Sequence, residues 1–351
     1  MAAPGPFHAW ALENMPRFCL VWMEGSTMQC KICDNAQGNR TYHVREMMFG
    51  YRDSFEYSEC SQCGCLQRVQ APADMAKYYP AAYYGFLPVD SKPPNFLKRI
   101  AKRQRGVYAL WDSGLLGRVF LRLFPYPQLR ALAKAELSRG SRILDVGAGS
   151  GKLLLAIKRA GLEELLGVDP FIERDFQYSN GLRIRKCSIY EVTGSWDLIM
   201  FHHSFEHFAD PLETLRYCSE LLSDKGRCLI GVPTASSYAW RKYRENWVQL
   251  DAPRHCFLHS LRSLELLAAK AGFRVEDVVY DSFELQFWGS EQYCRDIPIH
   301  DERSYAENPS KSIFSREDIR SFREEARALN ARKEGDQAIF YLSKTPRGES
   351  P

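Results

Sequence analysis

The chain has 351 residues, of which 45% are hydrophobic and 13% aromatic, and its 47 lysines and arginines against 43 acidic residues give a formal net charge of +4. This composition excludes a disordered or collagen-like chain, and so small a charge excess does not indicate a nucleic-acid-binding protein. The length predicts roughly two domains, and no apolar run reaches the ~18 residues that a membrane-spanning helix needs. We therefore expect a soluble protein, peripheral to a membrane at most.

Residues 1–27 are poorly patterned, so we expect a disordered extension, and Met28 is an alternative start to Met1. One basic residue, Arg17, before a short apolar stretch does not make a secretory signal. Six of the eleven cysteines are scattered singly, which favours reduced thiols and a cytoplasmic protein over a disulfide framework. These six are Cys19, Cys187, Cys218, Cys228, Cys256 and Cys294.

Two C-x2-C pairs lie in the first patterned segment, residues 28–70. They are Cys30 with Cys33 and Cys60 with Cys63, and Cys65 is a spare thiol that is the alternative to Cys63. Each pair can direct two thiolates at one tetrahedral ion, and four sulfur ligands suit Zn²⁺ without leaving a position for a catalytic water. We therefore predict a structural Zn²⁺ in a small zinc-ribbon-like module, which would gain folding energy from the ion.

An aromatic and basic helical connector, residues 71–140, follows the cysteine pairs. Residues 87–140 hold 11 basic and 3 acidic residues, centred on 98–105, and an apolar run follows at 114–124. The plain interpretation is a solvated helix face. The sharper hypothesis is peripheral contact with an anionic membrane, or a docking surface for a phosphate-bearing acceptor.

Short β-branched or apolar runs alternate with helical stretches over residues 141–345, before a tail at 346–351. This alternation predicts an α/β domain whose mostly parallel sheet has helices on both faces. The runs that we expect to be strands are 142–146, 165–169, 182–185, 197–201, 227–232, 274–280 and 338–343.

A glycine-rich turn follows the first of these strands. Gly147, Gly149 and Gly151 precede a helical stretch, Asp145 precedes the turn, and Asp169 ends the second strand. The glycines let a ligand approach the backbone, and the distal carboxylate is placed to accept ribose hydroxyls. The third glycine stands one position early for an NAD fingerprint, and Asp145 suits a cationic ligand better than a pyrophosphate.

This turn resembles the first motif, E/D-x-G-x-G-x-G, of the class I S-adenosylmethionine-dependent methyltransferases. The resemblance implies S-adenosyl-L-methionine as cofactor and a Rossmann-like sheet of seven strands, the last of them antiparallel, for which Gln337–Lys344 is the candidate. It also implies cofactor contacts after the third and fourth strands, for which we take Ser188, Ile189 and His202. An acid usual near the adenine in that family is absent here.

An ionisable cluster follows the fourth strand, where ligand chemistry lies in an open parallel sheet. If a helical turn starts there, His203, Glu206 and His207 share one face at i, i+3 and i+4. Methyl transfer to a hydroxyl needs a base, so we expect His203 or His207 in that role with Glu206 orienting it. The alternative roles are bracing the next helix, or holding a divalent ion as a related cluster does in the ubiquinone-pathway O-methyltransferases.

A second resemblance covers roughly residues 28–344. The segments Leu250–Ser260, with its Leu-Asp-Ala-Pro-Arg-His run, and Ser263–Phe273 resemble bacterial methyltransferases that carry a four-cysteine zinc module and are often encoded among cell-surface polysaccharide genes. The resemblance implies a sugar acceptor that is free, nucleotide-linked or lipid-linked, and it makes His255 a further candidate base. Candidate acceptor contacts are Tyr79, Tyr83, Tyr84, Arg254 and Trp288; a domain interface, or an ion pair of Asp251 with Arg254, is the alternative.

The leading functional hypothesis is therefore an O-methyltransferase that acts on a small or carbohydrate acceptor by in-line displacement with a histidine base. The alternatives are N-methylation of an amino sugar, and a non-enzymatic zinc-ribbon protein with a methyltransferase-like scaffold. Nucleic acid is not an expected partner, because the cysteine-rich segment has mixed charge with few lysines.

Overall fold

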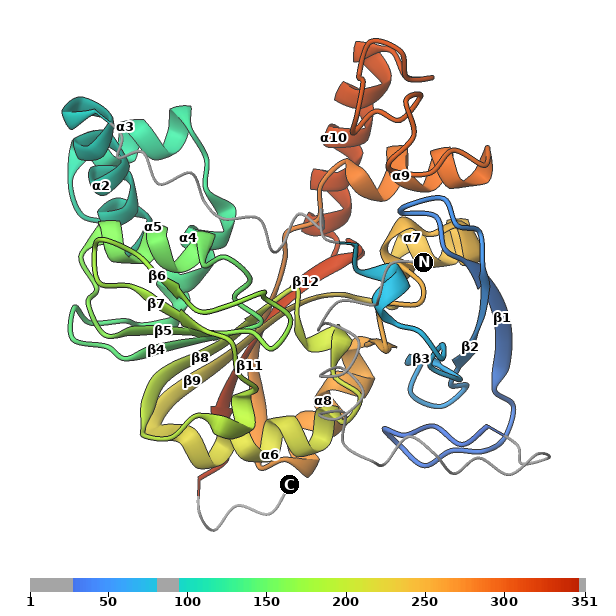
Figure 1. The fold of residues 1–351 in the computed structure, drawn as a ribbon, viewed down its shortest axis with the longest axis horizontal. Coiled ribbons are helices and arrows are strands. Elements are labelled where there is room, and N and C mark those ends of the chain that lie inside the picture. Colours follow the sequence, from blue (N-terminus) through green and yellow to red (C-terminus); the bar gives the residue numbers. More distant parts are fainter. Residues whose placement is uncertain (1–27, 81–94, 347–351) are drawn as a thin grey trace, which may run out of the picture.

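The computed structural model describes residues 28–80 and 95–346. Figure 1 shows a large sheet in the centre of the molecule, a smaller sheet at one side, and a pair of helices at the opposite corner. The expected extension at 1–27 and most of the tail, 347–351, lie outside the described residues.

The large sheet has eight strands in the order β11-β12-β9-β8-β4-β5-β7-β6. All seven expected strands are present, and β12 is antiparallel to both of its neighbours, as expected. The addition is β6, a two-residue edge strand paired antiparallel to β7. The strands are β4 (Ile143–Val146), β5 (Leu165–Val168), β6 (Phe176–Gln177), β7 (Arg183–Arg185), β8 (Trp196–His202), β9 (Leu222–Pro233), β11 (Phe273–Tyr280) and β12 (Gln337–Lys344).

Both faces of this sheet are buried by helices. Along β8, Leu198 and Met200 belong to one apolar cluster, whereas Ile199 and Phe201 belong to another on the opposite face. A strand buried on both faces has no polar alternation, which is why this one is almost continuously apolar. Figure 1 shows α6 (Pro211–Leu221) and α8 (Leu261–Lys270) on one face and α2 (Phe96–Trp111), α4 (Pro127–Ala131) and α5 (Lys152–Ala160) on the other.

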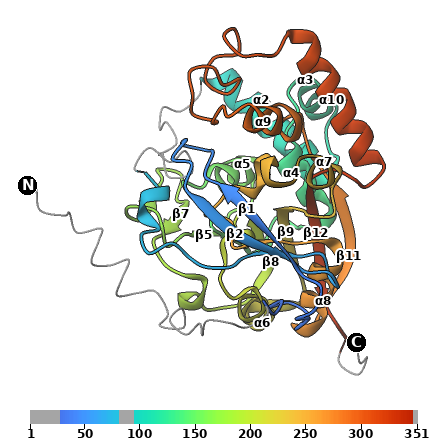
Figure 2. The same ribbon diagram turned by 90° about the vertical axis from the view of Figure 1, so that its right-hand side faces the viewer.

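The small sheet contains β1 (Arg40–Arg45), β2 (Ser54–Glu59), β3 (Leu66–Arg68) and β10 (Phe257–Leu258), in that order. Its last strand comes from the far end of the sequence, because Phe257 and Leu258 pair antiparallel with Gln67 and Leu66. Figure 2 shows this sheet in front of the large one. The N-terminal module is therefore completed by a strand that the sequence did not assign to it.

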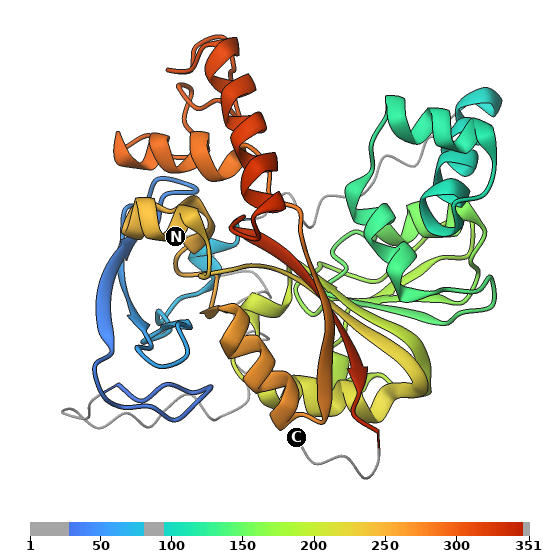
Figure 3. The ribbon, with the colours of Figure 1, turned by 180° about the vertical axis from the view of Figure 1, so that it is seen from behind.

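The remaining helices extend the molecule on two sides. α3 (Leu115–Leu123) packs on α2 at one corner, and Figure 3 shows α10 (Arg316–Ala331) leading into β12 at the other. No helix in the described ranges is long and apolar enough to span a membrane. The other helical segments are α7 (Tyr238–Tyr243), α9 (Leu285–Cys294), and the short 3-10 turns η2 (Ala76–Tyr78), η4 (Leu132–Ala135), η5 (Ile189–Glu191), η6 (Phe205–His207), η7 (Arg244–Asn246) and η8 (Val248–Leu250).

Candidate active site and cysteine cluster

The glycine turn lies between the end of β4 and the start of α5. Gly147, Gly149 and Gly151 have φ angles of 77°, 52° and 75°, a region that glycine occupies without strain. A Cβ on Gly147 would lie 2.3 Å from the Cβ of Ser204, so no larger residue fits there. The turn is thus in direct contact with the segment that follows β8.

Two buried acids stand beside this turn. Burial and the charge of Asp169 raise the pKa of Asp145 to about 7. The Asp169 carboxylate accepts hydrogen bonds from the backbone N–H groups of Gly149 at 2.9 Å and Phe171 at 2.8 Å, and burial still raises its pKa. Two carboxylates held this close favour a cationic ligand, so the residues present fit the ammonium and sulfonium of S-adenosylmethionine.

The three other expected cofactor contacts lie at the same edge of the sheet. Ser188 and Ile189 follow β7; the Ser188 hydroxyl accepts from Tyr190 N and so caps the η5 turn, while Ile189 is buried. His202 ends β8, and burial lowers its pKa to about 3, so it is neutral at physiological pH. Because parallel strands end together, these side chains border one edge.

The segment after β8 does not begin as a helix. His203 has a left-handed φ of 54°, and only the three residues of η6 form a 3-10 turn, so the expectation of a single helix face is wrong. The turn nevertheless brings His203 Nδ1 to 3.7 Å from Glu206 Oε1. Burial lowers the pKa of His203, but its interaction with Glu206 and the charges of Asp281 and Asp336 together raise that pKa.

Glu206 is the most unusual side chain of this segment. It is 1% exposed, and neither carboxylate oxygen has a hydrogen-bond partner within the described chain. Burial would raise the pKa of Glu206, yet His203, His207 and His255 lower it to about 2. A buried carboxylate without a hydrogen bond is costly, which makes Glu206 a candidate functional residue.

His207 and His255 complete the cluster. His207 Nδ1 lies 3.0 Å from the Arg254 carbonyl and His255 Nδ1 lies 2.8 Å from the Gln249 carbonyl, so each Nδ1–H donates to a carbonyl and each Nε2 carries a lone pair. His255 Nε2 is 3.8 Å from Glu206 Oε1, and burial lowers the pKa of His255 to about 4. One ligand atom from each of Glu206, His207 and His255 lies within 4.8 Å of the others.

Arg254, an expected acceptor contact, is engaged in contacts within the protein. It is 1% exposed, its guanidinium donates to Asp251 and Glu46, and its remaining Nη1 donates to Tyr78 O. The alternative ion pair with Asp251 is present, at 2.5 Å. Asp251 Oδ2 is also 3.7 Å from His255 Nε2, so this buried ion pair supports the loop that carries a site histidine.

Trp288, another expected acceptor contact, is 8% exposed and packs on Tyr305. Tyr79 is better placed: its ring stacks on Phe171 with centroids 5.8 Å apart, and its hydroxyl lies 3.5 Å from His207 Nδ1. Tyr79 therefore lies between the segment that follows Asp169 and the histidine cluster. Tyr83 and Tyr84 lie outside the described residues.

The sequence analysis did not identify two acidic residues that lie near His203. Asp281 and Asp336 both raise the pKa of His203 by their charge, and Asp336 accepts from Trp247 Nε1 at 3.0 Å. Asp281 directly follows β11 and Asp336 directly precedes the antiparallel β12. Acids at the carboxyl edge of the sheet were therefore detectable by the same strand-end rule that identified His203.

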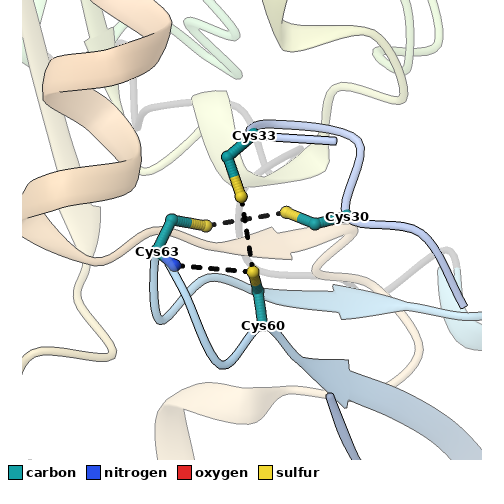
Figure 4. A group of neighbouring side chains, drawn as sticks. All are labelled: Cys30, Cys33, Cys60 and Cys63. Carbon is teal, nitrogen blue, oxygen red and sulfur yellow. Dashed lines mark hydrogen bonds between the residues drawn. The ribbon is translucent and has the colours of Figure 1, made fainter. Parts of the chain in front are cut away.

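The four cysteines of the two pairs converge on one point (Figure 4). Cys30 Sγ is 3.6 Å from Cys63 Sγ, and Cys33 Sγ is 3.4 Å from Cys60 Sγ. Four sulfurs at ~2.3 Å from a tetrahedral Zn²⁺ would be separated by about 3.8 Å, so this donor set fits the ion. Cys65 is not part of the cluster; its Sγ lies near Leu66 O and His259.

The small sheet also contacts the loop that carries His255. Tyr57 OH donates to the His255 carbonyl at 2.7 Å, Ser260 Oγ donates to the Cys63 carbonyl, and Arg68 Nη1 donates to the Pro253 carbonyl. These bonds run along residues 253–260, immediately beside β10. The small sheet thus fixes the backbone from which His255 projects.

Residues 114–278 match a family model described as a methyltransferase domain. Ubiquinone biosynthesis O-methyltransferase of Xanthomonas oryzae pv. oryzae is 25% identical in an alignment of 166 positions that covers 42% of this chain and 67% of that protein. The protein of the same name from Xanthomonas euvesicatoria pv. vesicatoria is 26% identical in an alignment of 184 positions that covers 48% of this chain and 77% of that protein.

Among solved structures, a SAM-dependent methyltransferase from Archaeoglobus fulgidus is 22% identical, with a TM-score of 0.40, over 65% of this chain and 99% of that one. The strand order with its antiparallel β12, the glycine turn and the family match together support class I S-adenosylmethionine-dependent methyltransferases as the class of this domain.

Proposed function

We propose that the protein transfers a methyl group from S-adenosylmethionine to a hydroxyl of a small or carbohydrate acceptor. The observation that carries the proposal is Glu206, whose unpartnered buried carboxylate faces two imidazoles next to the glycine turn. The name of the Xanthomonas relatives, an O-methyltransferase, supports an oxygen acceptor. The resemblance to polysaccharide-linked methyltransferases supports a sugar.

The cofactor, when bound, supplies an electrophilic methyl group on a sulfonium. Asp169 would accept the ribose hydroxyls, and Asp145 would face the cationic end. His203 is the proposed base: its side chain is 34% exposed, and the tautomer with a proton on Nδ1, towards Glu206, leaves Nε2 to take the acceptor proton. With the cofactor bound, the acceptor oxygen would be aligned with the methyl carbon, and S-adenosylhomocysteine would be the leaving group. Glu206 stabilises the imidazolium.

The four-cysteine cluster is proposed to hold a structural Zn²⁺. No fifth side chain among the described residues joins Cys30, Cys33, Cys60 and Cys63, so the ion would have no position for substrate. The scattered free thiols support a reducing, cytoplasmic setting for the enzyme.

Calorimetry with S-adenosylmethionine and a methyl-transfer assay on a panel of catechols, free sugars and nucleotide sugars test the proposal. We expect His203→Gln and Glu206→Gln to bind the cofactor within about twofold of the wild type while turnover falls by roughly a hundredfold. His300→Gln, remote and paired with Glu307, is the matched control. Absence of cofactor binding would contradict the enzymatic proposal and leave only the non-enzymatic alternative. Methylation of amines but not of hydroxyls would show that the acceptor atom is nitrogen.

A second candidate role for the same cluster is a divalent cation held by Glu206, His207 and His255. The specific observation is that both Glu206 oxygens are unpartnered while both histidines present lone pairs on Nε2. A bound cation would align an acceptor hydroxyl and lower its pKa. Metal analysis after addition of Mg²⁺ or Zn²⁺ should then find one equivalent beyond the cysteine-bound ion, and Glu206→Gln should lose only that equivalent. If the wild type and Glu206→Gln each contain only one equivalent of metal, the cluster holds no cation, and the histidine base is its remaining proposed role.

A further inference from the structure

Exposed apolar side chains are concentrated on one helical pair. Of the thirteen large hydrophobic residues that are exposed in the described chain, eight lie on α2 and α3 or next to them, and Leu115 and Leu97 are 82% and 74% exposed. We call these eight the hairpin face. They are Phe96, Leu97, Ile100, Leu115, Leu116, Val119, Leu123 and Phe124.

The packing of the two helices explains why α3 exposes leucines. Gly117 of α3 lies against α2, since a Cβ there would come within 2.3 Å of Gln104 O and 2.6 Å of Tyr108 Cβ. With 100° per residue, the opposite side of α3 carries its exposed apolar residues together with two arginines. Those on the outer side are Leu115, Leu116, Val119, Leu123, Arg118 and Arg122.

The hairpin is also strongly cationic and unpaired. Neither α2 nor α3 contains an acidic residue, and within the described chain none of their seven basic side chains has a carboxylate within ion-pair distance. Burial and the nearby charges of Arg159, Arg105 and Lys98 lower the pKa of Lys102, so the cations repel one another. The seven are Lys98, Arg99, Lys102, Arg103, Arg105, Arg118 and Arg122.

Neither the core nor the candidate site uses this face. The hairpin is anchored to the domain on its other side, where Gly106 of α2 meets Ala160 of α5 and the chain continues into α4. Figure 1 places the hairpin at the corner farthest from the small sheet. Among the described residues, the exposed leucines therefore have no apolar surface packed over them.

We propose that the hairpin face docks the protein on an anionic lipid bilayer, with the leucines in the interface and the basic side chains among the headgroups. Apolar insertion combined with several cations is the pattern of peripheral membrane attachment. Each basic side chain near an anionic surface strengthens the attraction to it. A second copy of the chain suits the face less well, because it would bring two sets of seven unpaired cations together.

Vesicle co-sedimentation of the full chain tests this proposal, with phosphatidylcholine vesicles that either contain or lack phosphatidylglycerol. We expect binding only to the anionic vesicles, weakening with added salt. The variant K98Q/R99Q/K102Q/R103Q and the variant L115S/V119S should each bind roughly tenfold more weakly or worse. The matched control is R316Q/R320Q/R327Q, which removes exposed arginines from α10 and should bind like the wild type.

Thermal unfolding and cofactor affinity, measured in parallel, show that each variant is folded. Absence of wild-type binding to anionic vesicles would overturn the proposal, as would wild-type binding by both hairpin variants. A wild-type dimer that L115S/V119S abolishes, without any vesicle binding, would assign the face to a second copy and overturn it as well.

Discussion

The two sheets of this protein are stabilised in different ways. The eight-stranded sheet is buried on both faces, by apolar clusters that its own helices complete. The four-stranded sheet shares its apolar contacts with later parts of the chain: Cys30, Cys60 and Cys63 belong to a cluster of the large sheet, and Tyr57 and Leu66 belong to a third cluster with Trp240 and its neighbours. A small sheet that shares its core in this way is expected to depend on those neighbours and on a bound metal ion.

This dependence runs in both directions. The small sheet receives β10 and in return holds the carbonyls of Pro253 and His255 by hydrogen bonds. Its Glu46 also accepts from Arg254, whose other carboxylate partner, Asp251, lies beside His255. The cysteine cluster is therefore expected to influence turnover by positioning the loop that carries His255, although the cluster takes no part in the reaction.

The largest expected effect comes from removing the metal. Cys60→Ser should lose one Zn²⁺ per chain and unfold the small sheet, since a structural ion contributes on the order of 10 kcal/mol to a module of this kind. Turnover should fall by roughly a hundredfold or more, because the His255 loop loses its support, whereas S-adenosylmethionine should still bind at the large sheet.

Metal analysis, calorimetry and the methyl-transfer assay check this prediction. Cys294→Ser, a change to an exposed thiol remote from the cluster, is the control and should alter none of them. Equal loss of cofactor binding and turnover in Cys60→Ser would show that the two sheets unfold together, which would remove the contrast between them.

A smaller effect is expected at the ion pairs between the sheets. Arg254→Met leaves the buried carboxylates of Glu46 and Asp251 without their cation, which should cost about 3–5 kcal/mol of unfolding free energy. Denaturant unfolding measures this loss. The double variant Glu46→Gln with Arg254→Met should recover part of it, because one uncompensated charge is removed. A loss below about 1 kcal/mol in the single variant would mean that the ion pair is not what joins the two sheets.

The smallest effect concerns the large sheet alone. Asp145 has a pKa of about 7, so it holds a proton near neutral pH that a cationic cofactor should expel. Affinity for S-adenosylmethionine should therefore fall by about fivefold from pH 7 to pH 6. Calorimetry in buffers of different ionisation enthalpy should detect proton release at pH 7, and Asp145→Asn should abolish it.

The stability of the cofactor-free protein should respond in the opposite sense. Because folding raises the pKa of Asp145 from its ordinary 3.8, the folded state binds this proton more tightly, and stability is lost as the pH rises towards 7. Asp145→Asn should flatten that slope in thermal unfolding between pH 5 and pH 8, while zinc content stays unchanged. An unaltered slope would mean that ionisation of Asp145 does not destabilise the folded protein.

The features that the sequence predicted are local ones. The seven strands, the glycine turn and the two C-x2-C pairs each lie within a few consecutive residues, where periodicity and spacing are informative. The pairings of β10 with β3 and of Arg254 with Glu46 join segments about two hundred residues apart, and no spacing rule reaches that far. The expected helix face failed because His203 enters a left-handed conformation before a 3-10 turn.

The late arrival of β10 has a consequence for synthesis of the protein on the ribosome. Ser260, which bonds to the Cys63 carbonyl, follows that cysteine by 197 residues, and β10 lies just before it. At typical elongation rates this separation corresponds to roughly 10–40 s. During that interval the cysteine pairs are already outside the tunnel while their sheet lacks an edge strand, so early capture of the ion would protect the nascent thiols and the open edge of β3 from wrong partners.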